Sequence, residues 1–172
     1  MSGSGRTPPR TVRQGGRLKA YRPIGEVERR TAFDAAIAAY ERGDAFLAHE
    51  LLEPAWMGTA DEAERDLYQG LIKLAAAEVH AVRGNARGVG KNLRGALLRL
   101  ERAAGGGFDG GLDLPALCGA ITARLAGLEA GDEAPGRPLS GLARAIHPPS
   151  AHRAPPEPGR AARRGKRAWP GS

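Results

Sequence analysis

A histidine, two glutamates and a tryptophan lie close together in the segment AFLAHELLEPAWMG. His49 and Glu53 are four residues apart, so on a helix they are neighbours on one face, with Glu50 at the edge of that face. Trp56 lies one turn further along the helix and would line one side of the same site. Because Phe46 shares this direction, the spacing predicts that the polar pair lies on the apolar face. A buried imidazole or carboxylate there needs a hydrogen bond, an ion pair or a metal ion.

A second polar line follows in the segment LYQGLIKLAAAEVH. Gln69 and His80 are eleven residues apart, which returns them to within about 20° of one direction at about 100° per residue. Lys73 falls on the same line. This line is opposite the broad apolar arc of its helix, so periodicity alone predicts a solvated face.

One interpretation of these residues is a divalent metal site. Two imidazoles and a carboxylate, from His49, His80 and Glu53, would leave open positions for water and substrate. Glu50 or Glu53 would then serve as the base for metal-assisted hydrolysis. The spacing is His-Glu-x-x-Glu and lacks the His-Glu-x-x-His pattern that sets two imidazoles over one zinc ion.

The alternative interpretation is a hydrogen-bond network that ties the second helix to the third, with Gln69 and Asn85 bonding to backbone ends. The same cluster would also suit an organic ligand or a partner-binding face. The residues leave these alternatives open. No reaction or substrate follows from them.

Several blocks of the chain resemble a known family. The strings AHELLEPAW, LYQGLIKLAAAEVH and RGNARG, in this order ahead of a leucine-rich helix, are similar to a prokaryotic family catalogued as domain of unknown function three hundred and nine, over about residues 33–100. The resembling positions are His49, Glu53, Trp56, Gln69-Gly70-Leu71, His80, Gly84-Asn85 and Gly88. The resemblance implies an all-helical fold and supplies no established activity.

Two residues depart from the family pattern. Pro54 falls inside the motif helix, where it lacks an amide hydrogen and its ring crowds the carbonyl of Glu50. We therefore expect the second helix to kink or end near Pro54, with Trp56 packed over its terminus. Val89 replaces the alanine that the family prefers.

Five helices must position these residues. Hydrophobic periodicity, caps and glycine stops predict helices over residues 26–42, 45–58, 61–84, 86–103 and 113–130, with Asp44, Asp61 and Asp113 as N-terminal caps. No segment shows the alternation of a strand. The predicted fold is an all-α antiparallel bundle over residues 26–131, flanked by basic disordered tails over residues 1–25 and 132–172.

The net charge of +7 is divided unevenly along the chain. Residues 1–30 carry a net charge of +6, residues 31–136 of −6 and residues 137–172 of +7. The bundle is thus acidic, and an inference toward nucleic acid applies to the arginine-rich tails alone, which would give weak, salt-dependent contacts.

Other compositional features limit the protein class. No apolar run approaches the roughly 18 residues that a membrane span needs, so we expect no membrane and a cytoplasmic location. The single cysteine, Cys118, excludes an intramolecular disulfide and suits small core filler. The sequence leaves the oligomeric state open.

Overall fold

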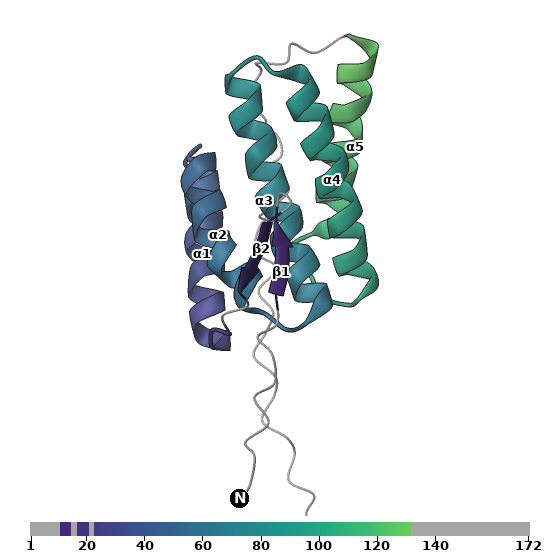
Figure 1. Ribbon diagram of the computed structural model, residues 1–172. Helices are drawn as coiled ribbons and strands as arrows, with labels where there is room; N and C mark the ends of the chain where they lie inside the picture. The colour runs from purple at the N-terminus through teal and green to yellow at the C-terminus, as the bar shows by residue number, and fades with distance from the viewer. Residues whose placement is uncertain (1–10, 15–16, 21–22, 132–172) are drawn as a thin grey trace, which may run out of the picture.

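Five helices dominate the computed structural model, which describes residues 11–14, 17–20 and 23–131 (Figure 1). They are α1 (Glu26–Glu41), α2 (Ala45–Gly58), α3 (Glu62–Val82), α4 (Ala86–Gly105) and α5 (Leu114–Ala130). Successive helices run in opposite directions, and α3 packs between α2 and α4, with α1 against α2 and α5 against α4 (Figure 1). The predicted all-α bundle is confirmed.

Short acidic or amide side chains start four of the helices. Asp44 accepts a hydrogen bond from the backbone N–H of Leu47, and Asp61, Asn85 and Asp113 do the same for α3, α4 and α5. Each bond satisfies an amide that has no partner inside the helix. These caps fix where the helices begin, and so they fix which side chains face one another.

All five helices contribute to the core, which consists largely of leucine and alanine. Its largest fully buried residues include Leu67, Leu74, Leu93, Leu100 and Leu117. Gly70 permits a close approach of α3 to α4, because a Cβ at Gly70 would lie 2.8 Å from the side chain of Leu100. The two helices pack tightly along this line, which holds the turn between them in one position.

A short hairpin precedes the bundle. Strands β1 (Thr11–Gln14) and β2 (Arg17–Ala20) pair antiparallel, with Thr11 opposite Ala20. The sequence pattern predicts no strand here and a disordered tail over residues 1–25. Four-residue strands are too short to show a period of two, and Gly15-Gly16, of the type favoured in two-residue hairpin loops, was the available signal.

The remaining parts of the two predicted tails, residues 1–10, 15–16, 21–22 and 132–172, lie outside the described residues. Within the described part of the chain, no helix is long and apolar enough to cross a membrane.

Candidate functional sites

The polar motif of α2 lies beside the buried face of that helix. The buried face consists of Ala45, Ala48, Leu52, Ala55, Trp56 and Gly58. Phe46, which periodicity predicts on the apolar face, is 65% exposed. The core face is therefore rotated away from the predicted direction. His49 is half-buried, and its Nδ1 lies 3.2 Å from Oε1 of the exposed neighbour Glu50.

Pro54 does not end α2. The helix continues to Gly58, with the proline itself exposed on its surface. Trp56 lies inside the helix and is only 3% exposed, while Glu53 is half-buried. The indole Nε1 of Trp56 is buried, and within residues 23–131 no hydrogen-bond acceptor reaches it. Trp56 is thus a core residue of α2.

His80 and Asn85 meet at the turn between α3 and α4. The amide nitrogen Nδ2 of Asn85 lies 3.1 Å from Nδ1 of His80, and Oδ1 of Asn85 accepts from the backbone N–H of Gly88 at 2.9 Å. Gly84 supplies the left-handed conformation, with φ +67°, that ends α3. A Cβ at Gly88 would lie 2.6 Å from the imidazole of His80. These residues form one interlocked turn.

The line of Gln69, Lys73 and His80 is half-buried against α4. Lys73 lies across Gly95, where an added Cβ would approach its side chain to 2.9 Å. The solvated face that periodicity predicts is therefore partly covered. The reason is that glycines on α4 leave room for long polar side chains of α3.

The structure does not gather the predicted metal ligands. Among residues 23–131, no group of three or more His, Cys, Asp or Glu side chains is arranged to hold a metal ion, so His49, Glu53 and His80 do not make such a group. The hydrogen bonds of the two histidines form separate local pairs, one within α2 and one at the α3–α4 turn.

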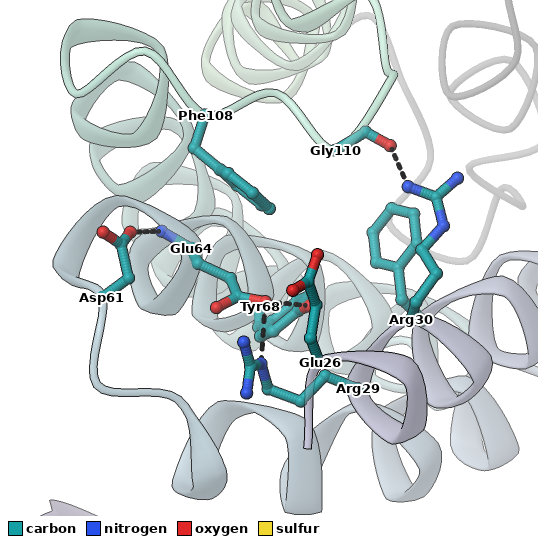
Figure 2. Close-up of a pocket in the computed structure, with 9 residues that line it drawn as sticks. Glu26, Arg29, Arg30, Asp61, Glu64, Tyr68, Phe108 and Gly110 are labelled. Carbon is teal, nitrogen blue, oxygen red and sulfur yellow. Dashed lines mark hydrogen bonds and ion pairs between the residues drawn. The ribbon is translucent and has the colours of Figure 1, made fainter. Parts of the chain in front are cut away.

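A different polar cluster forms the floor of an open hollow of about 330 Å³. Glu64, in the first turn of α3, is 6% exposed. Its carboxylate accepts hydrogen bonds from Nε of Arg29 at 2.9 Å and from the hydroxyl of Tyr68 at 2.7 Å (Figure 2). It also accepts a hydrogen bond from the hydroxyl of Thr59. Arg29 also donates to the backbone oxygen of Ile24 at 2.7 Å. The cluster joins α1 to the start of α3.

Electrostatics keep this carboxylate ionised. Burial alone would raise the pKa of Glu64, but the hydrogen bonds from Arg29, Thr59 and Tyr68, together with the charge of Arg29, lower that pKa overall. Burial and the neighbouring Glu64 raise the pKa of the Tyr68 phenol. Both groups therefore keep their ordinary protonation states at neutral pH.

The rim of the hollow carries one acid and one base between aromatic rings. Figure 2 shows Glu26 and Phe108 directed into the hollow, with Arg30 reaching across it toward the loop between α4 and α5. Arg30 donates to the backbone oxygen of Gly110 at 3.2 Å, and its guanidinium lies 5.4 Å from the ring centroid of Phe33. A second hollow of about 220 Å³ continues along α1 beyond Arg30.

The comparisons bear on the helices that hold the histidine and glutamate motif. Residues 33–92 match the family model described as a domain of unknown function (DUF309). The resemblance predicted from the motif strings is therefore confirmed. No curated protein and no solved structure matches the chain.

The DUF309 match and the hollow overlap only in part. The matched range holds Glu64 and Tyr68 on α3, whereas Glu26, Arg29 and Phe108 lie outside it. The hollow therefore combines matched helices with flanking segments.

The floor of the hollow is not predicted by the sequence pattern. In the sequence, Asp61 and Glu64 have the spacing of a capping box, in which the Glu64 side chain would bond to the helix start. In the structure Asp61 caps the helix, but the Glu64 side chain turns to Arg29, Thr59 and Tyr68. The available signal was the four-residue spacing of Glu64 and Tyr68, which places both on the face that packs.

Proposed function

We propose that this bundle is a binding module and that its ligand site is the open hollow between α1, α3 and the loop of residues 106–113. In this proposal the ligand is a small zwitterion of the amino-acid type. The histidine and asparagine motif then has a structural role, holding α3 and α4 in register. The observation that carries the proposal is the pairing of one acid and one base on the rim above a floor whose charges are already satisfied.

The size of the hollow favours a small ligand. Its volume of about 330 Å³ is at the lower end of the range of about 300–1,000 Å³ typical of ligand sites. The rings of Phe33 and Phe108 supply apolar walls. An aliphatic or aromatic side chain of modest size would fill the space between them.

The charges of the floor are already paired with groups of the protein itself. The carboxylate of Glu64 accepts three hydrogen bonds, and Arg29 donates both to Glu64 and to the backbone of Ile24. Asp61 is engaged as the cap of α3. Recognition of a charged ligand therefore falls to Glu26 and Arg30.

The two rim residues offer complementary charges. Glu26 is exposed and would accept from a ligand ammonium group. Arg30 donates to Gly110 and Asp34 but has five N–H donors in all, so it retains donors for a ligand carboxylate. A zwitterion satisfies both rim residues at once, whereas a singly charged ligand satisfies one.

The test is a titration of the ¹⁵N-labelled full chain with each common amino acid, followed by amide chemical shifts. We expect shifts centred on residues 64–68 and 108–110 with at least one amino acid. The N-acetylated and carboxyl-amidated forms of that amino acid, which each lose one charge, should bind at least about tenfold more weakly, equivalent to about 1.4 kcal/mol.

A matched pair of variants locates the site. Glu26→Gln removes the rim acid, while Glu28→Gln removes an exposed acid from the same first turn of α1, outside the hollow. Binding should weaken about tenfold or more in the first variant and stay unchanged in the second. Equal effects of both substitutions, or an absence of shifts at these amides with every amino acid, would contradict the proposal.

A further inference from the structure

The basic charge of the folded part of the chain is concentrated on α4. This helix carries five basic residues and one acidic residue, although residues 31–136 as a whole have a net charge of −6. Arg87, Lys91, Arg94 and Arg102 are exposed, and Arg99 is half-buried. The acidic bundle therefore has one strongly basic face.

Part of this basic charge lies in one row beside α3. At about 100° per residue, Lys91, Gly95, Arg99 and Arg102 fall within an arc of about 80° on α4. The neighbouring row on α3 contains Asp66, Gln69, Lys73 and His80. Contacts of Arg99 with Asp66 and of Gly95 with Lys73 bring the rows together. We call Lys73, Lys91, Arg99 and Arg102, with the intervening Gly95, the α3–α4 strip.

Lys73 is a half-buried cation of the strip. Its stem lies over Gly95, and among residues 23–131 no carboxylate lies within ion-pair distance of its ammonium group, whereas Arg99 is held by Asp66. Burial and the positive charges of Arg99 and Lys91 lower the pKa of Lys73. Like charges held together in this way are stabilised by an anion that binds among them.

We propose that the α3–α4 strip binds the phosphate backbone of a nucleic acid without reading its sequence. From Lys91 to Arg102 the cations extend over about 16 Å of helix at about 1.5 Å per residue, which is long enough for several phosphates. The strip contains no aromatic side chain on which a base would stack. Its contacts are therefore directed to the backbone.

Charge density favours a nucleic acid over an acidic polypeptide. Duplex DNA carries about one charge per 1.7 Å of its axis, whereas an extended chain of acidic residues carries at most one per about 3.3 Å. The chain has a net charge of +7, with the largest basic excess in its terminal segments. This net positive charge attracts a dense polyanion to the chain.

The experiment measures binding of the full chain to a short fluorescein-labelled DNA duplex of mixed sequence, by anisotropy over a series of salt concentrations. The double variant Lys73→Gln, Lys91→Gln removes two strip charges and keeps the stem of residue 73 over Gly95. We expect affinity to fall at least about tenfold and the salt slope to fall by about 2, at about 0.9 for each lost phosphate contact.

The control variant removes two charges elsewhere. Arg42→Gln, Arg94→Gln changes an exposed residue at the end of α1 and a residue of α4 that pairs with Glu129 at 3.3 Å, outside the strip. It should leave the salt slope unchanged, and both variants should keep the helical circular dichroism of the parent chain. Equal losses in the two variants would overturn the proposal, as would an unaltered slope in the strip variant. Stronger strip-dependent binding to polyglutamate than to the duplex would overturn it too.

Discussion

At the scale of single residues, Glu64 shows how one buried charge connects two helices. Its carboxylate is almost fully removed from solvent, and three donors from α1, α3 and the α2–α3 turn surround it. A buried carboxylate without such partners would be strongly destabilising. The cluster therefore fixes how the first turns of α1 and α3 meet beneath the hollow.

The pH dependence of stability should report this cluster. The partners favour the ionised form, so the pKa of Glu64 is lower in the folded chain than its unfolded value of about 4.3. Its stabilisation is present above the unfolded value and is lost as pH falls through the folded value. Glu64→Gln should lower the free energy of unfolding by about 1–3 kcal/mol at neutral pH.

Urea denaturation between neutral and acidic pH provides the measurement. The difference between the parent chain and Glu64→Gln should narrow below about pH 4, as the parent carboxylate becomes protonated. Glu62→Gln, which changes an exposed acid in the same turn of α3, serves as the control and should have little effect. A constant difference across this pH range would show that Glu64 is not stabilised as an anion.

At the scale of elements, the α3–α4 turn explains why histidine, asparagine and glycine residues that resemble a ligand site occur together in the sequence. Gly84 provides the left-handed end of α3, and Asn85 caps α4. Nδ1 of His80 accepts a hydrogen bond from the side-chain amide of Asn85. Gly88 leaves the space that the imidazole occupies. His80, a residue type that often binds metals, therefore has a structural role in the connection between α3 and α4.

Substitution at Gly88 tests this interpretation. Gly88→Ala should destabilise the chain by about 1–3 kcal/mol, because the new methyl group would overlap His80 and Asn85. In the background of His80→Ala the same substitution should cost less, since the imidazole is gone; a coupling of about 0.5–3 kcal/mol is expected for contacting residues. Thermal or urea unfolding of the four proteins in this cycle measures the coupling.

Gly119→Ala is the matched control for this cycle. Gly119 is exposed on α5 and has no neighbouring side chain in the space of an added Cβ. The alanine should therefore stabilise the helix by about 0.5–1 kcal/mol. Destabilisation of similar size at both glycines, or strictly additive effects at Gly88 and His80, would count against the interlocked turn.

The same elements show what the sequence could predict. Local signals are sufficient for the helix starts, because Asp44, Asp61 and Asp113 each bond to an amide three residues ahead. The rotation of α2 was predicted incorrectly. Periodicity predicts Phe46 as a core residue, but alanines at positions 45, 48 and 55 lie on the packed face instead. Alanine is a weak signal in a hydrophobic pattern, although it allows helices to approach closely.

The candidate site was harder to predict than the helices. The Arg29–Glu64 pair spans 35 positions, and Phe108 joins the hollow from a loop beyond α4. No spacing rule connects such distant residues. The α4 glycines that cover Lys73 and His80 likewise have meaning only once α3 and α4 are side by side.

At the scale of the whole molecule, the order in which the helices pack determines which helix can open without disrupting the others. Helix α3 is covered by α2 on one side and α4 on the other, while α1 and α5 are the outer helices (Figure 1). The outer helices differ in their polar anchors. α1 is tied to α3 through the buried carboxylate of Glu64 and Arg29, whereas Glu129 of α5 pairs with Arg94 of α4 at the exposed surface.

Native-state hydrogen exchange should follow this order. Amides of α3 that lie among Leu67, Leu71 and Leu74 should exchange last, through global unfolding, because opening α3 disrupts contacts on both of its sides. The α5 amides should exchange through a smaller opening, since release of α5 leaves the α2–α3–α4 packing in place. The apolar side chains of α5 that this opening exposes are Leu114, Leu117, Ile121 and Leu125. Glu64→Gln should speed exchange in α1 before it affects α5. If α5 were instead protected as strongly as α3, the bundle would unfold as one unit and its outer helix would not be separable.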